Sequence, residues 1–468
     1  MTRKKTLIAG FVGLPAVLAA AFLIVIGPWP AYQDSRYRES DYYRAALDAI
    51  AASASKSEKT ASPGRLHAGW AKRAITPEIG APLGGYSGRK GGMESTGVRD
   101  ELYVRALALH DGVDTAVILG SDMLIIPPNL SSAVLEQVGA RTGLTPDQIL
   151  FNASHTHCGP GGFMPGLVSK FSGGAYDEAR MARIIAAFAE AAVEAHGALE
   201  PASIAAGSAD APEYIRNRTR DGAPVDSELS FMLVRQDDGD VCYVASYSAH
   251  PTVFGSRMMA FSAEYPGELM RFIEEETGHD ALYLGGAVGS MGPRAPEGED
   301  DGARVTAMGR ALGSLILASD DALAFTDHAD IAPAGAAVGM PPFQLRPFEN
   351  RPHLRLSPAA GYLLGLRREG WIHGVRIGDL FLVGTPFDFC GETSVVWKEW
   401  AREHGLDLWA LSFCSTYCGY LSPDKHYWDV PLNYETGPMG WFGPNTEAYF
   451  TDLFQALVQG LAVTEGRS

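Results

Sequence analysis

Short apolar runs alternate with amphipathic segments through most of this chain, and that alternation constrains the fold more than any other feature of the sequence. Long amphipathic helices are predicted over residues 177–196, from near Pro266, and near 303–317 and 393–404. The strand-like runs between them include YVRALAL, TAVILGSDML, ILFNAS, FMLVRQ, VCYVASYSAH, ALYLGGAVG, GDLFLVGTP and LWALSFCS. Alternation of this kind predicts an α/β fold with mixed β-sheets flanked by helices.

The 468 residues are sufficient for a large core, with 46% hydrophobic and 20% charged residues. Residues 31–65 contain a helix-like stretch and a polar linker at 52–64, and no repeat or boundary follows. We therefore expect one large domain over residues 66–468. The net charge of −17 repels phosphate backbones, so no nucleic-acid partner is expected.

The N-terminus carries Arg3, Lys4 and Lys5 ahead of an uncharged apolar run from Leu7 to Ile26. Twenty apolar residues are enough to span a bilayer, and no cleavage site follows closely, which favours an uncleaved membrane anchor within residues 1–30. A cleaved signal segment is the alternative. Either way, the positive charges predict that the rest of the chain lies outside the cytoplasm.

Five cysteines are an odd number for an exported chain, so at least one thiol must be free or intermolecular. Cys158, Cys390, Cys414 and Cys418 lie close to segments with polar strand ends, and the sequence leaves any disulfide pairing open. Structural zinc sites usually have closely paired cysteines such as C-x2-C, so a cysteine-based metal site is not expected.

The stretch NASHTHCGPGG, residues 152–162, places two histidines one residue apart where an apolar strand runs into a glycine- and proline-rich loop. Side chains of a strand alternate between its faces, so His155 and His157 are expected to point into one volume. Two histidines that only hydrogen bond backbone groups at a loop would give the same sequence pattern. The pair alone therefore does not distinguish a functional site from a structural role.

Other predicted strands also end in polar residues that can take part in chemistry. VASYSAH ends at His250, the run through TPFDFCGE carries Asp388 and Glu392, and LWALSFCSTYCGY carries Tyr417 and Tyr420. Binding groups often collect at strand ends, where loops can vary without disturbing the core. Two histidines, a carboxylate and a further oxygen ligand suit a hydrolytic zinc site with an open position.

These segments together resemble the N-terminal catalytic domain of the neutral/alkaline non-lysosomal ceramidases. The resemblance covers most of residues 67–450. It rests, in order, on AITPEIGAPLGGYSGR, GVRDELYVRALAL, NASHTHCGPGG, NRTRDGAPVDSEL, YSAHPTV, YLGGAVGSMGPR and STYCGYLSP with the later FGPNT. The histidine segment is the most specific of these, and the others gain weight from their order along the chain.

The resemblance implies a zinc ion held by four residues, namely His155, His250, Asp388 and Tyr420. The family usually has a glutamate where this chain has Asp388, and Glu392 is an alternative carboxylate ligand four residues later. The resemblance places His157 beside the metal but outside its ligand shell, as a hydrogen-bonding group for the reacting oxygen. Arg218 matches a family arginine that could contact substrate, although a solvated loop arginine is an equal interpretation.

Two departures from the family bear on function. Gly292 and Ser290 stand where the family has a catalytically implicated serine and an aspartate, so a serine nucleophile is not expected at this position. The chain also ends about twenty residues after Gly443, whereas the family continues into a C-terminal β-sandwich module. Ceramide itself as the substrate is therefore in doubt.

The function that the resemblance implies is hydrolysis of an amide bond in a lipid-like N-acyl substrate by metal-activated water. The aromatic residues of HYWDVPLNYETGPMGWF, residues 426–442, could form an apolar entrance for the acyl chain or could be ordinary packing. An esterase with the same zinc site and a non-catalytic lipid-binding relative are the alternatives. The remaining histidines are expected to be surface or structural groups, among them His110, His196, His279, His328, His353, His373, His404 and His426.

Overall fold

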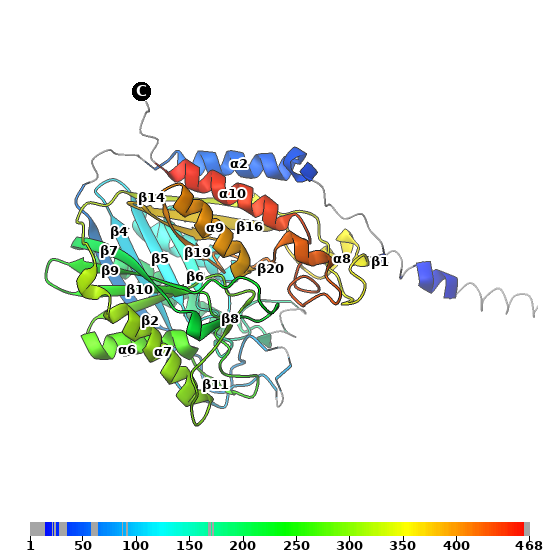
Figure 1. Ribbon diagram of the computed structural model, residues 1–468, viewed down its shortest axis with the longest axis horizontal. Coiled ribbons are helices and arrows are strands. Elements are labelled where there is room, and N and C mark those ends of the chain that lie inside the picture. Colours follow the sequence, from blue (N-terminus) through cyan, green and yellow to red (C-terminus); the bar gives the residue numbers. More distant parts are fainter. Residues whose placement is uncertain are drawn as a thin grey trace, which may run out of the picture.

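A computed structural model describes residues 15–20, 22, 25–27, 35–57, 64–86, 88–89, 92–166, 170 and 173–462. Two β-sheets form its centre (Figure 1). The eight-stranded sheet has the order β12-β10-β9-β7-β2-β4-β5-β6. Its strands, in that order, are β12 (Asp280–Gly285), β10 (Val241–Tyr247), β9 (Glu228–Gln236), β7 (Glu200–Asp210), β2 (His67–Ala74), β4 (Tyr103–His110), β5 (Thr115–Ser121) and β6 (Ile149–Ala153). The four-stranded sheet has the order β14-β16-β17-β19, with bounds Ile331–Gly339, Glu369–Ile377, Leu380–Gly384 and Asp407–Leu411.

Both sheets mix parallel and antiparallel neighbours. β10 and β12, β5 and β6, and β17 and β19 are parallel pairs, and the other neighbours are antiparallel. The structure also contains four two-stranded ribbons. They pair β1 (Ile26–Gly27) with β15 (Arg355–Leu356), β3 (Gly97–Val98) with β11 (Ala260–Phe261), β8 (Ile215–Asn217) with β13 (Met291–Pro293), and β18 (Asp388–Phe389) with β20 (Tyr420–Leu421).

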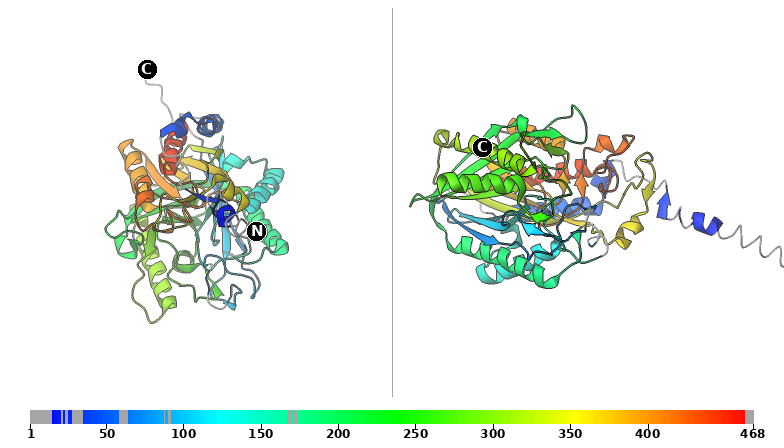
Figure 2. Two further views of the ribbon diagram at one scale, coloured as in Figure 1. Left: turned by 90° about the vertical axis from the view of Figure 1, so that its right-hand side faces the viewer. Right: turned by 90° about the horizontal axis from the view of Figure 1, so that it is seen from below.

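Helices cover the outer faces of the two sheets (Figures 1 and 2). Helices α3 and α5 pack on one half of the eight-stranded sheet, α6 and α7 pack on its other half, and α2, α9 and α10 pack on the four-stranded sheet. The helix bounds are Asp41–Ala54 for α2, Pro128–Thr142 for α3, Glu178–Gly197 for α5, Glu264–Thr277 for α6, Asp301–Leu317 for α7, Pro358–Leu363 for the short α8, Gly391–Glu403 for α9 and Thr446–Leu461 for α10. The inner faces of the sheets share one apolar cluster, so the layers are helix, sheet, sheet, helix.

The local sequence explains why these elements form. In α5, the Asp177 carboxylate accepts from the Arg180 backbone N–H and caps the first turn, and Ile184, Phe188 and Ala192 recur on the buried face. Burial of a side chain the size of Phe188 contributes roughly 1.5–3 kcal/mol to folding. The predicted α/β fold with mixed sheets flanked by helices is confirmed. Helices α3 and α10 were not predicted.

The start of the folded body differs from the prediction. Helix α2, expected to precede the domain that begins at residue 66, buries Ala46 and Ile50 in the cluster it shares with β14 and α10. Its Ser53 hydroxyl accepts from the Gly335 N–H of β14 at 3.0 Å. Residues 35–57 therefore belong to the packed structure, because α10 and the outer face of β14 need a second apolar helix to cover them.

The predicted membrane-spanning run, Leu7 to Ile26, falls largely outside the described residues. Among the residues that the structure does describe, no helix is long and apolar enough to cross a bilayer. The anchor stays a prediction. All five cysteines are free and buried, so the disulfide left open by the sequence does not form.

A buried ion pair ties α9 to the eight-stranded sheet and yields a stability prediction. Lys398 Nζ lies 2.9 Å from Asp226 Oδ1 and 3.1 Å from Glu228 Oε1, with the Lys398 and Asp226 side chains almost fully buried. Replacing Lys398 by methionine leaves Asp226 buried without its cation, which should lower the free energy of unfolding by ~3–5 kcal/mol. Urea unfolding measures the change.

The matched control is Arg141→Met, which breaks the exposed pair between Arg141 and Glu190. Exposed pairs contribute up to ~1 kcal/mol, so this variant should unfold close to the wild-type midpoint. Equal losses in the two variants would contradict the difference in burial on which the prediction rests.

Candidate metal site

The candidate site forms where the two edges of the eight-stranded sheet approach each other. Asn152, near the end of β6, accepts from the Gly285 N–H at 2.6 Å and donates to the Gly285 carbonyl at 3.2 Å and to the Ser412 carbonyl at 2.8 Å. A side chain at Gly285 would meet the Ala153 carbonyl at 2.4 Å, so the close approach of β6 and β12 requires glycine. Asn152 thus joins the ends of β6, β12 and β19.

The backbone at His155 differs from the strand that the sequence predicted. β6 ends at Ala153, and His155 has φ of 67° in the left-handed region. The His155 ring stacks on Phe413, itself at φ 58°, with a centroid distance of 4.1 Å. His155 and His157 do face one volume, but a strained turn rather than strand alternation brings them together.

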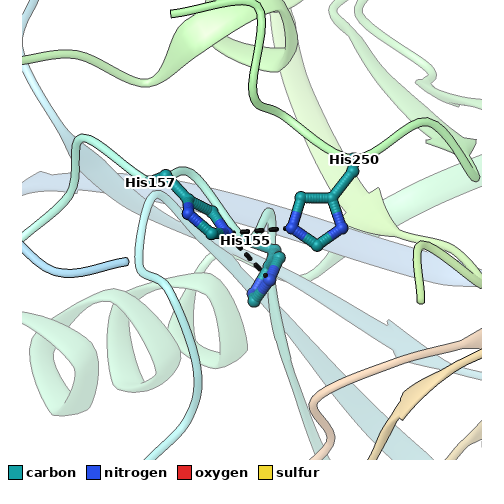
Figure 3. Close-up of side chains that lie close together, drawn as sticks. All are labelled: His155, His157 and His250. Carbon is teal, nitrogen blue, oxygen red and sulfur yellow. Dashed lines mark hydrogen bonds between the residues drawn. The ribbon is translucent and has the colours of Figure 1, made fainter. Parts of the chain in front are cut away.

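Three histidines converge at this point with their Nε2 atoms facing one another (Figure 3). His157 Nε2 lies 3.2 Å from His155 Nε2 and 2.9 Å from His250 Nε2. His250 follows β10, while the other two follow β6. The ligand nitrogen atoms of the three histidines all lie within 4.8 Å of one another, so one metal ion could contact them together.

The hydrogen bonds on the far side of two rings determine which nitrogen carries the proton. His155 Nδ1 donates to the Leu124 carbonyl at 2.5 Å, and His250 Nδ1 donates to the Val288 carbonyl at 3.1 Å. A carbonyl only accepts, so in the neutral rings both Nε2 atoms present bare lone pairs. His157 Nε2 can donate one proton, which satisfies one of them at most. A cation between the three nitrogens satisfies them all, and these residues therefore fit a metal ion.

Burial keeps the imidazoles neutral, as metal ligands must be. Without a metal ion, burial lowers the pKa of His155 to about 3, and it lowers the pKa of His157 and His250 well below the usual value. Arg218 lowers the pKa of all three histidines further by its positive charge. Neutral imidazoles at neutral pH need not lose a proton before they bind a metal.

Asp388 supplies a carboxylate next to the histidines. Its Oδ2 lies 3.5 Å from His155 Nε2, and both of its oxygens are buried with no hydrogen-bond partner in the described part of the chain. Burial raises the pKa of Asp388 to about 7. β18 and β20 are parallel, with Asp388 opposite Tyr420, so the two residues predicted as oxygen ligands come from paired positions. An unpartnered buried carboxylate is consistent with a metal ligand.

Glu392, the alternative carboxylate, is engaged elsewhere. Its Oε1 accepts from Asn217 at 2.8 Å, and its Oε2 accepts from the Ser290 hydroxyl. Ser290 also accepts from the Gly391 N–H at 3.0 Å. Glu392 thus anchors the start of α9 to the ribbon of β8 and β13, and the unpartnered Asp388 remains the better candidate for the metal.

Arg218 lies at the side of the site formed by Gly289 and Tyr420. Its guanidinium donates to the Gly289 carbonyl at 3.0 Å and to the Tyr420 hydroxyl at 3.4 Å. A side chain at Gly292 would meet Arg218 Cβ at 3.1 Å, so the glycine that replaces the family serine also leaves room for Arg218. Arg218 therefore has a defined place beside Tyr420 rather than that of a solvated loop arginine.

Three residues that support His157 were not among the site residues predicted from the sequence. The Tyr86 ring packs on the His157 ring at a centroid distance of 4.7 Å, and Arg89 donates to the His157 carbonyl. Gly85 lies against His157 as well, where an added Cβ would come within 2.6 Å of the ring and φ is 98°. All three residues lie in the GGYSGR segment, residues 84–89, which is one of the segments that resemble the ceramidase family. That segment was the signal that could have identified them.

The nine other histidines are not part of the group. His373 is fully buried and donates to the Asp147 carbonyl at 2.8 Å, a structural role. The segment 426–442 is divided between packing and surface. Tyr427 and Phe442 lie in the interior, whereas Trp428 and Tyr434 are exposed and Tyr434 packs on Tyr420 at 5.3 Å.

The fold and this site together define an α/β sandwich protein with a group of three converging imidazoles that could hold a metal. The sequence model described as neutral/alkaline non-lysosomal ceramidase, N-terminal, matches residues 66–282. The neutral ceramidase of Pseudomonas aeruginosa has a similar structure, with a TM-score of 0.70, 17% identity, and coverage of 86% of this chain and 75% of that chain. A ceramidase complexed with C2 gives a TM-score of 0.69 at 16% identity, over 85% and 75% of the two chains.

No curated protein sequence matches the chain significantly. The resemblance to the neutral/alkaline ceramidases is confirmed by sequence over residues 66–282 and by the common fold over most of the chain.

Proposed function

We propose that this chain is a zinc-dependent amidohydrolase that cleaves the amide bond of a lipid-like N-acyl substrate. One observation carries the proposal. Three neutral imidazoles, those of buried His155 and His250 and of half-buried His157, direct their Nε2 atoms at one another. The unpartnered carboxylate of Asp388 lies 3.5 Å from His155 Nε2. His155, His250, Asp388 and Tyr420 are the proposed ligands, because nitrogen and oxygen donors from separate strand ends suit zinc.

Zinc bound there would polarise the substrate carbonyl and activate a water molecule for attack. His157 is placed to hydrogen bond to the oxygen on which negative charge develops, and the Arg218 cation reinforces it from beside Tyr420. The leaving amine needs a proton, which Tyr417 or His157 could supply. Burial, and to a lesser extent the negative charge of Asp388, raises the pKa of Tyr417 well above its usual value, so Tyr417 remains protonated.

The route needs no serine nucleophile, which is consistent with Gly292. An ester would react at the same site with a better leaving group, and a chain that binds lipid without turnover is the other alternative. The proposal also includes attachment to a membrane through residues 1–30 with the domain outside the cytoplasm, on the strength of the charges and the apolar run at the N-terminus.

The substrate proposal predicts a dependence on acyl-chain length. Exposed Trp428 and Tyr434 stand on the segment next to Tyr420 and offer apolar contact for a chain whose amide lies at the site. A series of N-acyl amines from acetyl upward should show kcat/KM rising by at most about fourfold per methylene, since each buried methylene contributes ~0.8 kcal/mol. The rise should end when the apolar surface is filled.

The series is measured with and without a ceramide head group, and with matched esters. A flat or falling response to chain length would reject a lipid-like substrate while leaving the metal site intact. Turnover of esters alone would favour the esterase, and zinc binding without any turnover would favour the non-catalytic relative.

A further inference from the structure

Helix α8 exposes apolar side chains to solvent at its C-terminal end. Leu363 is 89% exposed, Tyr362 is 55% exposed and Leu364 is 42% exposed. Leaving adjacent large apolar side chains in water forgoes the stabilisation of burial, and such groups often mark a surface that contacts a partner or a membrane. Phe348, Trp428, Val430 and Tyr434 add exposed apolar groups on neighbouring loops.

The N-terminal apolar run ends at the base of this helix. Ile26 of β1 pairs with Leu356 of β15, and the Ser357 N–H donates to the Val25 carbonyl at 2.7 Å, directly before α8 begins at Pro358 (Figure 1). Residues 7–26 are uncharged and apolar. A membrane that takes up this run would therefore lie next to α8.

The segment around α8 is basic by sequence, in contrast to the whole chain. Residues 341–370 contain five arginines and two glutamates, whereas the chain as a whole carries a net charge of −17. Two of these arginines, among them Arg367, are exposed, and so are both glutamates. Arg368 is half-buried and donates to the Tyr362 hydroxyl at 3.0 Å and to the Met340 carbonyl, which holds the end of the helix in place. An exposed cation next to exposed apolar groups is a feature that anionic lipid attracts.

A row of aromatic rings joins α8 to the candidate site. Tyr362 packs on Phe343 at a centroid distance of 5.5 Å, Phe343 stacks on Phe442 at 5.3 Å, and Phe442 meets Phe387 at 6.4 Å. Phe387 directly precedes Asp388. One packed row of aromatic rings thus links the exposed end of α8 to the residue that precedes Asp388.

We propose that the α8 surface, formed by Tyr362, Leu363, Leu364 and Arg367, is a membrane-contacting surface. Leu363 and Leu364 insert into the outer part of an anionic bilayer while Arg367 meets its phosphates. The contact orients the folded domain so that the side joined to the site by the aromatic row faces the lipid. It adds a second attachment point to that predicted at the N-terminus.

The test uses the full chain with Leu363→Cys carrying an environment-sensitive fluorophore. The five native cysteines are buried and the introduced one is exposed, so the label is directed to position 363. Vesicles of phosphatidylcholine with phosphatidylglycerol should shift the emission to the blue, and brominated acyl chains should quench it. Val113→Cys, at a 47% exposed position between β4 and β5, is the matched control and should show neither change.

Arg367→Gln on the labelled protein should weaken the response to anionic vesicles about fivefold and leave the response to pure phosphatidylcholine unchanged. A label at 363 that responds no more than the label at 113 would overturn the proposal. So would a blue shift that grows with protein concentration in the absence of lipid, since it would identify α8 as an interface between copies of the chain. None of these readouts involves turnover, so they are separate from the proposed reaction.

Discussion

Replacement of His155 or His250 by alanine should remove most of the zinc and nearly all hydrolytic activity. The wild-type protein should carry about one zinc per chain, and each variant loses a ligand whose Nδ1 is fixed by a backbone carbonyl. Loss of the several kcal/mol that a metal contributes to the transition state corresponds to a fall in kcat/KM of at least about 10³. Metal analysis and kinetics on an N-acyl amine measure both effects.

His404→Ala is the control for the loss of a histidine as such, because His404 is exposed at the end of α9 and bonds the Trp400 carbonyl. It should keep its zinc and its activity. Full zinc occupancy in both the His155 and His250 variants would show that the metal lies elsewhere.

Replacement of His157 by alanine should leave the zinc in place and lower kcat by about 10² to 10³. This magnitude is expected when a single contact to the developing oxyanion is removed. The ratio of zinc to protein is the decisive companion measurement, because His157 Nε2 lies as close to the other two imidazoles as a third ligand would. Loss of zinc from this variant would make His157 a ligand and leave the oxyanion contact to Arg218.

A second variant separates position from chemistry at His157. Tyr86→Leu removes the ring that packs on His157 but no polar atom of the proposed site. If His157 acts mainly through its hydrogen bond, this variant should lower kcat by less than the alanine variant does and should keep its zinc. An effect as large as that of the alanine variant would mean that packing, and not hydrogen bonding, dominates at this histidine.

Periodicity alone predicted the helices from 177, 303 and 393 and the strands that precede His155 and His250. Each of these elements buries a continuous face, so the sequence pattern and the tertiary packing agree. Helices α2 and α10 pack on β14 and on each other across more than 390 residues of sequence. The pattern of either helix gives no indication of such a distant partner.

The sequence by itself determined the α/β architecture, the histidine motif and the candidate residues, because local periodicity and short motifs depend on neighbours in the chain. The tertiary structure decided which carboxylate lies beside the histidines without a hydrogen-bond partner. Asp388 and Glu392 are both candidate carboxylates in the sequence. In the folded chain, Glu392 accepts hydrogen bonds from Asn217 and Ser290, whereas Asp388 has no hydrogen-bond donor among the described residues. It also placed His157 between the other two imidazoles, since a left-handed turn at His155 sets the direction of the side chains. Contacts between residues far apart in sequence made these choices.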